Sequence, residues 1–198
     1  NLVIKDGNNC TANVDYVVRP QLQLSPSLDK ALDCNLPTPN AAVKVEAIGG
    51  AGVGSYTYTI TAGPVVNTTG ATTGIFTGLD AGNYTFEVND GACTATATFT
   101  IDPIPTTILA APTVTDVSCN GGSDGTITVN VTAGEGPFEY QLDAGAFQTS
   151  NQFTGLAAGT TYVVTVRNAK QCTLASLPIT IAAPSALSAG SLLTTKLS

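Results

Sequence analysis

The sequence predicts an all-β fold made of tandem antiparallel β-sandwiches. Short stretches alternate between polar and apolar residues, such as TITVNV at residues 126–131 and TATATFTI at residues 94–101. Runs rich in Gly, Asn, Asp and Pro separate these stretches, at spacings of about 8 to 15 residues. No window combines apolar residues at helical spacing with capping residues, so we expect essentially no helix.

A repeat supports this prediction. Residues 76–84 are FTGLDAGNY and residues 153–162 are FTGLAAGTTY; Cys93 and Cys172 follow these motifs at matching positions. Each Cys opens a Thr-rich alternation that closes on Ile and Pro, CTATATFTIDP in one case and CTLASLPITIAAP in the other. The first twenty residues match the tail of the same unit, with Cys10 aligned to Cys93. We therefore expect a window of a longer tandem array.

The period gives the expected domain organisation. Two units are complete, and the flanks are partial: residues 1–25 end a preceding repeat, residues 26–105 and 106–184 form the two repeats, and residues 185–198 begin a following one. The junctions at residues 19–28 and 103–114 are spaced by Pro rather than by flexible Gly/Ser runs. Because Pro stiffens a linker, we expect an elongated, semi-rigid rod.

Each unit contains a series of predicted short strands. In the first unit they are residues 42–48, 56–60, 84–88 and 94–101; in the second they are residues 126–131, 138–142, 162–166 and 173–181. Short strands separated by turns favour an immunoglobulin-like sandwich. In such sandwiches a Tyr at the start of the penultimate strand bonds back to backbone upstream, and Tyr84 and Tyr162 are placed for this tyrosine corner.

Five Cys and no His favour disulfides over a metal site, because no two Cys have the short spacing of zinc ligands. We predict that Cys34 pairs with Cys93 and Cys119 with Cys172, so that Cys10 pairs outside the window. A small unit gains most from linking its own distant segments, by roughly 4 kcal/mol per loop. The alternative pairs Cys10 with Cys34 and Cys93 with Cys119. Either pattern implies an oxidising, extracellular compartment.

The charge excludes some functions. The net charge is −7 and charged residues make up 11% of the chain, so no basic stripe is present to bind nucleic acid or an anionic bilayer. No apolar run is long enough to span a membrane.

Catalysis has little support, because there is no His and most carboxylates are in turn sequences, so we expect neither an enzyme nor a cofactor. Calcium is the alternative. Its ligands would be Asp124 with Asn120 and Ser123, or Asp102 and Asp116 near the junction, although no loop holds three closely spaced acidic residues.

The second unit resembles a known family. VSCNGGSDGTITVNVTAGEGPFEY (residues 117–140), followed by FTGLAAGTTYVVTVRNAKQC (residues 153–172), is similar to the repeat of SprB-type gliding-motility adhesins of Bacteroidetes. In the first unit the opening LDCNLPTPNAAVKVEA lacks the Gly-Gly-Ser-Asp-Gly turn, and the likeness depends on FTGLDAGNY and the flanking Cys.

The resemblance implies a large adhesin at the cell surface, exported by the type IX secretion system and working with the motility machinery. Its partners would be neighbouring repeats and a polysaccharide or other substratum. Two other functions remain open: a passive spacer in a secreted enzyme, and a subunit of a polymerising filament that buries a strand edge between chains.

Overall fold

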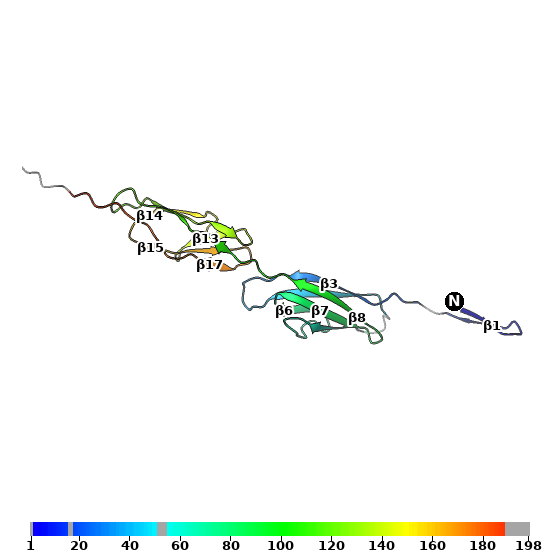
Figure 1. The fold of residues 1–198 in the computed structure, drawn as a ribbon. Coiled ribbons are helices and arrows are strands. Elements are labelled where there is room, and N and C mark those ends of the chain that lie inside the picture. Colours follow the sequence, from blue (N-terminus) through cyan, green and yellow to red (C-terminus); the bar gives the residue numbers. More distant parts are fainter. Residues whose placement is uncertain (1, 16–17, 51–54, 189–198) are drawn as a thin grey trace, which may run out of the picture. The chain divides into compact units, whose positions relative to one another are not determined.

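The computed structural model describes residues 2–15, 18–50 and 55–188, and every regular element in them is a β-strand (Figure 1). All strand pairs are antiparallel. The all-β prediction is therefore confirmed. The chain divides into two compact units, one made of Asn1–Leu32 and Leu36–Pro103, the other of Asp33–Asn35 and Ile104–Ser198.

The chain starts with a separate hairpin. β1 (Leu2–Lys5) pairs with β2 (Thr11–Val14), with Lys5 opposite Thr11 across the turn. This hairpin has the sequence that aligns with the last two strands of a complete repeat.

Two three-stranded sheets form the sandwich of unit 1. One sheet has the order β3-β4-β6 and the other β5-β7-β8. The strands are β3 (Gln23–Lys30), β4 (Ala41–Ile48), β5 (Thr57–Ala62), β6 (Ile75–Leu79), β7 (Gly82–Asn89) and β8 (Thr94–Ile101).

Aromatic side chains from both sheets meet in the core of unit 1. Phe76 of β6 and Phe86 of β7 are fully buried, and their ring centroids are 5.4 Å apart. Tyr84 stacks on Phe86 at 6.0 Å. Since β6 and β7 belong to different sheets, the contact between Phe76 and Phe86 joins the two layers of the sandwich.

Unit 2 repeats this plan with interrupted strands. Its strands are β9 (Ile108–Leu109), β10 (Thr113–Thr115), β11 (Gly125–Thr128), β12 (Val131–Ala133), β13 (Glu139–Leu142), β14 (Gln152–Leu156), β15 (Thr161–Tyr162), β16 (Val164–Arg167), β17 (Thr173–Ala175) and β18 (Ile179–Thr180). The sheets β10-β11-β14 and β13-β16-β17 match the two sheets of unit 1, and the short pairs β9-β12 and β15-β18 extend them.

Proline accounts for two of the interruptions. Pro112 separates β9 from β10, and Pro178 separates β17 from β18. Each Pro lacks the N–H that a continuous ladder needs. The predicted strand at residues 173–181 is therefore two short strands, whereas the Pro-free β8 runs unbroken over Thr94–Ile101, as predicted.

The repeated FTGL motif holds one special backbone position in each unit. Gly78 and Gly155 have φ angles of 69° and 74°, in the left-handed region that suits glycine. Gly78 lies in β6, which pairs with β4, and Gly155 lies in β14, which pairs with β11; each pairing has a register shift at the first residue of β4 or β11. The motif is conserved between the two units because the same bend recurs.

Both corner tyrosines bond to backbone upstream. The Tyr84 hydroxyl donates to the carbonyl oxygen of Asp80 (3.1 Å) and accepts the N–H of the same residue (3.0 Å). The Tyr162 hydroxyl does the same with Ala157, at 3.2 and 3.0 Å. Burial raises the pKa of Tyr84, so the hydroxyl stays a neutral donor and acceptor.

Removal of the Tyr162 hydroxyl should destabilise unit 2. Tyr162→Phe leaves the N–H and carbonyl of Ala157 without this partner, so we expect the free energy of unfolding to fall by about 1–2 kcal/mol. Tyr140→Phe is the matched control, because Tyr140 is also 8% exposed and burial is the sole cause that raises its pKa. Denaturant unfolding would measure the free energy of unfolding of both variants. An equal loss of stability in both would contradict the role of the Tyr162 hydroxyl in the tyrosine corner.

Candidate functional site at the cysteine hairpins

The structure contains a disulfide between Cys34 and Cys172, with their Cα atoms 4.9 Å apart. Cys34 lies between β3 and β4, and Cys172 lies between β16 and β17. The predicted pairs Cys34–Cys93 and Cys119–Cys172 are therefore wrong, and so is the alternative pair Cys10–Cys34. The thiols of Cys10, Cys93 and Cys119 are free and exposed.

Strand geometry explains why the predicted pair in unit 1 does not form. The connection that holds Cys34 leads into β4, whose first residue Ala41 pairs with Leu79. Three residues beyond Leu79, β7 begins at Gly82, which pairs with Ile101 at the end of β8. Cys93, in contrast, immediately precedes β8. Eight strand residues, about 25 Å, therefore separate the two ends, far beyond the Cα separation of about 7 Å that a disulfide can bridge.

Unit 2 has the same arrangement. The N–H of Val117 donates to the carbonyl of Ala182 (3.2 Å), and the N–H of Ala182 donates to Asp116 Oδ1 (2.8 Å). The connection that holds Cys119 therefore lies beside the end of β18. Cys172 precedes β17, at the opposite end of the unit. We name these two places the connection end and the hairpin end of a unit.

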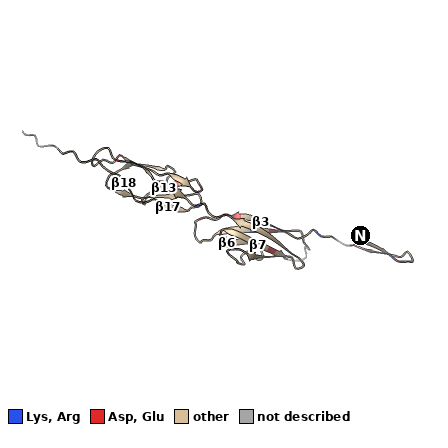
Figure 2. Ribbon diagram, in the orientation of Figure 1, with Lys and Arg blue, Asp and Glu red and all other residues tan. Residues whose placement is uncertain are grey.

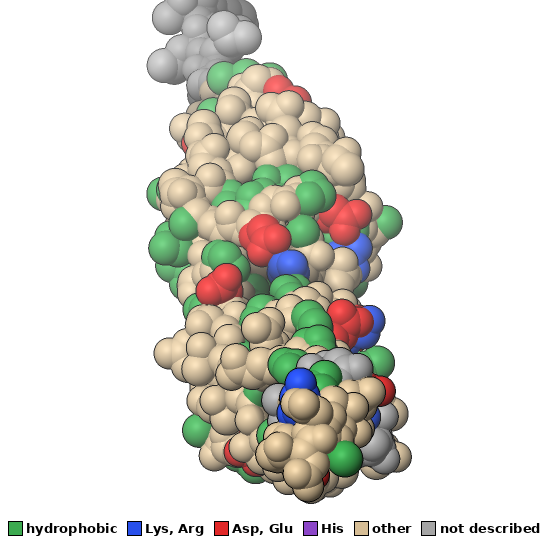
Figure 3. Space-filling model, turned by 90° about the vertical axis from the view of Figure 1, so that its right-hand side faces the viewer, with side chains coloured by type: hydrophobic (Ala, Val, Ile, Leu, Met, Phe, Trp, Pro, Cys, Tyr) green, Lys and Arg blue, Asp and Glu red, His purple; other side chains and the backbone are tan. Residues whose placement is uncertain are grey.

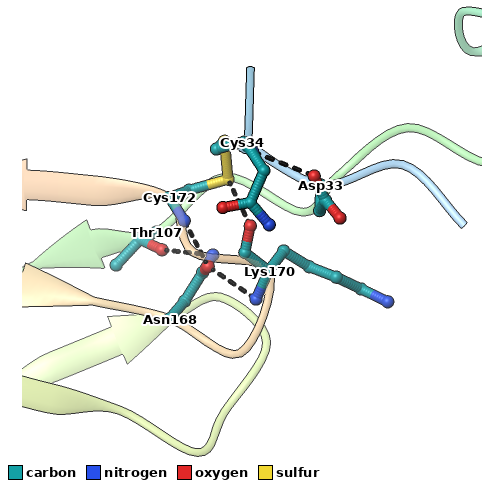
Figure 4. The surroundings of a disulfide bond; sticks show 7 residues. Asp33, Cys34, Thr107, Asn168, Lys170 and Cys172 are labelled. Carbon is teal, nitrogen blue, oxygen red and sulfur yellow. Dashed lines mark hydrogen bonds between the residues drawn. A yellow bond between two sulfur atoms is a disulfide. The ribbon is translucent and has the colours of Figure 1, made fainter. Parts of the chain in front are cut away.

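Asn168 fixes the hairpin that carries Cys172 (Figure 4). Its Oδ1 accepts the N–H groups of Lys170 (2.9 Å) and Cys172 (3.0 Å), and its own N–H donates to the carbonyl of Cys172 (3.0 Å). Asn168 is only 2% exposed, and its Nδ2 donates to Thr107 Oγ1 at 3.4 Å. One buried amide therefore holds the turn in a single conformation that presents Cys172.

Lys170 contributes two further contacts. Its carbonyl accepts the N–H of Cys34 at 2.8 Å, next to the disulfide. Its ammonium lies 3.5 Å from Glu135 Oε1, in a partly exposed ion pair. The hydrogen bond from Cys34 to the Lys170 carbonyl supports the disulfide, because it aligns the backbone of Cys34 with the hairpin that carries Cys172.

The two free hairpin cysteines, Cys10 and Cys93, have the same support. The N–H of Cys10 donates to Asp6 Oδ1 (2.9 Å) and that of Cys93 to Asp90 Oδ1 (2.8 Å). In each case the N–H of the Asp donates back to the carbonyl of the Cys, at 3.0 and 3.1 Å. The sequence analysis missed these acceptors. The recurrence of Asp or Asn three or four residues before a Cys-Thr pair is the signal that could have found them.

The residues considered for calcium have roles in the turns. Hydrogen bonds from Ser118, first from its side chain, hold the pKa of Asp124 below its usual value. Asp116 accepts the N–H of Ala182, and the Asn120 amide donates to the carbonyl of Pro184 (2.9 Å). In residues 2–15, 18–50 and 55–188, no three His, Cys, Asp or Glu side chains gather where they could hold a metal ion.

Unit 2 also has an apolar groove between the edges of its sheets. Its volume is about 620 Å³, and it lies between residues 107–112 and 174–179. Ile108, Leu174 and Leu177 of these segments are 52%, 38% and 85% exposed. Few residues on the ribbon are coloured as charged (Figure 2), and charged side chains are scattered over the face shown in Figure 3. The features available for binding are therefore the exposed thiols and the apolar groove. The described residues include no helix that could span a membrane.

The comparison with protein families identifies part of unit 2. Residues 111–147 match the SprB repeat. The match begins just before β10 and ends after β13, and it includes Cys119 and the turn that follows it. It confirms the resemblance drawn from the sequence and supports a structural repeat protein of the cell surface. None of the curated proteins matches the chain.

Three of the solved structures that match the chain are of the S-layer protein SbsC. Domains 4 and 5 of the S-layer protein SbsC have 15% sequence identity and a TM-score of 0.38, with 84% of this chain and all of that chain covered. A longer chain, rSbsC(31-844), has 18% identity, a TM-score of 0.37 and coverage of 86% and 29%. SbsC domains 1–6 have 16% sequence identity and a TM-score of 0.38, with 90% of this chain and 30% of that chain covered. The chain spans about 30% of the length of these two longer S-layer chains.

Replacement of Asn168 should show which of its atoms hold the hairpin. Asn168→Ala removes the acceptor of two N–H groups, and we expect the free energy of unfolding of unit 2 to fall by about 1–3 kcal/mol. Asn168→Asp keeps this acceptor, as Asp6 and Asp90 do in the other hairpins, so we expect a smaller loss. Urea unfolding under non-reducing conditions would measure both. A loss with Asp as large as that with Ala would contradict the role of Oδ1.

Proposed function

We propose that this chain is a repeat segment of a large secreted adhesin or filament at the cell surface, and that its physical task is to provide reach while resisting extension. The observation that carries the proposal is the disulfide from Cys34 to Cys172, which closes a loop with a sequence separation of 138 residues that contains the strands from β4 to β16. Export by the type IX secretion system and a part in gliding belong to this proposal through the likeness to SprB repeats.

The disulfide changes the path of a pulling force. A tether is pulled through its two ends, and the tension follows the shortest covalent path. This path runs along the chain to Cys34, across the two sulfur atoms, and on from Cys172. All strands from β4 to β16 lie inside the closed loop. Strands inside the loop can separate, but they cannot add length to the tether while the bond is intact.

The surface suits contact with neutral, hydrated material. Charged residues are 11% of the chain, and the exposed positions of β8 and β17 include several Thr. Hydroxyl groups both donate and accept hydrogen bonds, as the hydroxyls of polysaccharides do. Binding to a polysaccharide or similar substratum is therefore the attachment that we propose for such a surface.

Pulling on single molecules would test the reach. With the disulfide intact, we expect the full extension to be shorter by roughly 450–500 Å than after reduction, because each residue released from the loop adds about 3.3–3.6 Å. Force spectroscopy between the two termini would measure this difference. The control is the Cys34→Ser, Cys172→Ser variant, which should extend fully in both conditions. Equal extension of the unaltered chain before and after reduction would refute the proposal.

Attachment needs its own experiment. Beads coated with the chain should adhere to agarose or other neutral polysaccharide more than beads coated with serum albumin. Adhesion should survive high salt, because few charges contribute. Bead adhesion no better than that of the albumin control would favour a passive spacer and would remove attachment from the function of this segment.

A further inference from the structure

We propose that Cys119 is a covalent acceptor site for the cysteine hairpin of another copy of this unit, and that Cys10 and Cys93 are the matching donors. The bond would be a disulfide of the same type as Cys34–Cys172. This inference does not depend on adhesion or on a tether function, because it rests on the equivalence of the cysteine positions between repeats.

Cys119 has the same local setting as the bonded Cys34. Each lies four residues after the end of a first strand, β3 at Lys30 or β10 at Thr115. Two residues before each Cys is a buried apolar side chain, Leu32 (8% exposed) or Val117 (4%). Both Cys are exposed and are followed by Asn. The connection end of unit 2 therefore presents Cys119 from the position at which Cys34 already forms a bond.

Cys10 matches the bonded Cys172 even more closely. Each Cys lies four residues after an Asx side chain that accepts its N–H, Asp6 or Asn168. The residue before each Cys, Asn9 or Gln171, has a positive φ of 68° or 62°. The N–H of that residue donates at 3.0 Å to the carbonyl of the same Asx residue. The two hairpins therefore present their sulfur atoms in the same way.

Cys93 lies in a similar hairpin with a shorter turn. Its Asx residue, Asp90, is three residues upstream rather than four, and it accepts the N–H of Cys93 at 2.8 Å. Cys93 directly precedes β8, as Cys172 directly precedes β17. We expect it to react with the same partner as Cys10, although its turn is one residue tighter.

The position of each Cys within its unit requires a partner from elsewhere. Within unit 2, Cys119 lies at the connection end and Cys172 at the hairpin end, and Cys172 is already bonded to Cys34. A free connection-end cysteine therefore needs the hairpin of a further copy. That copy can be a repeat of the same polypeptide or a second molecule, since both present the same chemical group.

The bond forms by thiol–disulfide exchange. The thiolate of one cysteine attacks oxidised glutathione, releases one reduced glutathione and forms a mixed disulfide. The thiolate of the second cysteine then displaces the second glutathione. The two protein thiols together lose two electrons and two protons, and one oxidised glutathione becomes two reduced molecules.

Oxidation of the purified chain would test the pairing. The 198-residue protein is incubated with oxidised glutathione at increasing protein concentration, and non-reducing electrophoresis with peptide mass spectrometry identifies the pairs. We expect linked species in which Cys119 is joined to Cys10 or Cys93. Linkage by chance would instead include Cys119–Cys119, Cys10–Cys10 and Cys10–Cys93 in comparable amounts, and this outcome would overturn the proposal.

Three variants make the test selective. Cys119→Ser removes the acceptor, and the Cys10→Ser, Cys93→Ser double variant removes both donors; each should lower the linked species by about tenfold or more while Cys34–Cys172 stays intact. Cys10→Ser alone is the matched control, because Cys93 remains and linkage should continue. Unchanged linkage with Cys119→Ser would refute the acceptor role without affecting the proposed tether.

A longer chain distinguishes the two sources of the hairpin. In this longer protein, Ile181 is followed directly by a second copy of residues 102–198. The join copies the natural junction between Ile101 and Asp102, so a further repeat with its own Cys119 and Cys172 is added. A bond between the first Cys119 and the added Cys172 at all protein concentrations would assign the partner to the next repeat. A concentration-dependent ladder of the 198-residue chain would assign it to a second molecule. A bond between Cys119 and Cys93 or Cys10 within one 198-residue molecule would overturn the inference.

Discussion

The cysteines of this chain are governed by one geometric constraint: each sandwich carries one of them at either end. The two ends are separated by the length of a strand, about 25 Å, while a disulfide requires Cα atoms within about 7 Å. Cysteines at the opposite ends of one sandwich therefore cannot form a bond with each other. The observed bond obeys this constraint, because Cys34 follows the first strand of one repeat and Cys172 lies in the last hairpin of the next.

Two local devices make both ends of a sandwich well defined. At the hairpin end, an Asx side chain accepts the N–H of the cysteine, as Asn168 does for Cys172. At the other end, a tyrosine hydroxyl bonds both backbone groups of a residue four or five positions upstream. In both cases the polar group bonds to backbone a few residues away, so it specifies a local conformation.

The sequence predicted strands best where side-chain alternation was uninterrupted. β8 has the predicted bounds, and β4 differs by a single residue at its start. The first strand of each unit was missed, because Pro26 and Pro112 made these segments resemble linkers. β3 nevertheless contains Pro26, since it is an edge strand and one side of its backbone makes no ladder bonds. Local sequence does not show which strands will lie at an edge.

The disulfide could not be predicted for a related reason. The prediction of Cys34–Cys93 and Cys119–Cys172 assumed that a small unit links its own distant segments, whereas loop entropy alone ranks the longer loop of Cys34–Cys172 higher. Loop entropy does not include which end of a sandwich each residue occupies. That information comes from the pairing of Ala41 with Leu79 and of Gly82 with Ile101, which are contacts between distant parts of the chain.

The position of the disulfide also bears on what holds one sandwich together. Small domains often depend on an internal disulfide because their cores are limited. Here no disulfide joins the two ends of one sandwich, so its stability comes from its core and its corner tyrosine. In unit 2 this core includes Ile127, Val164 and Val166, all fully buried. The disulfide closes a loop that contains the strands from β4 to β16, so it limits how far the chain can be extended.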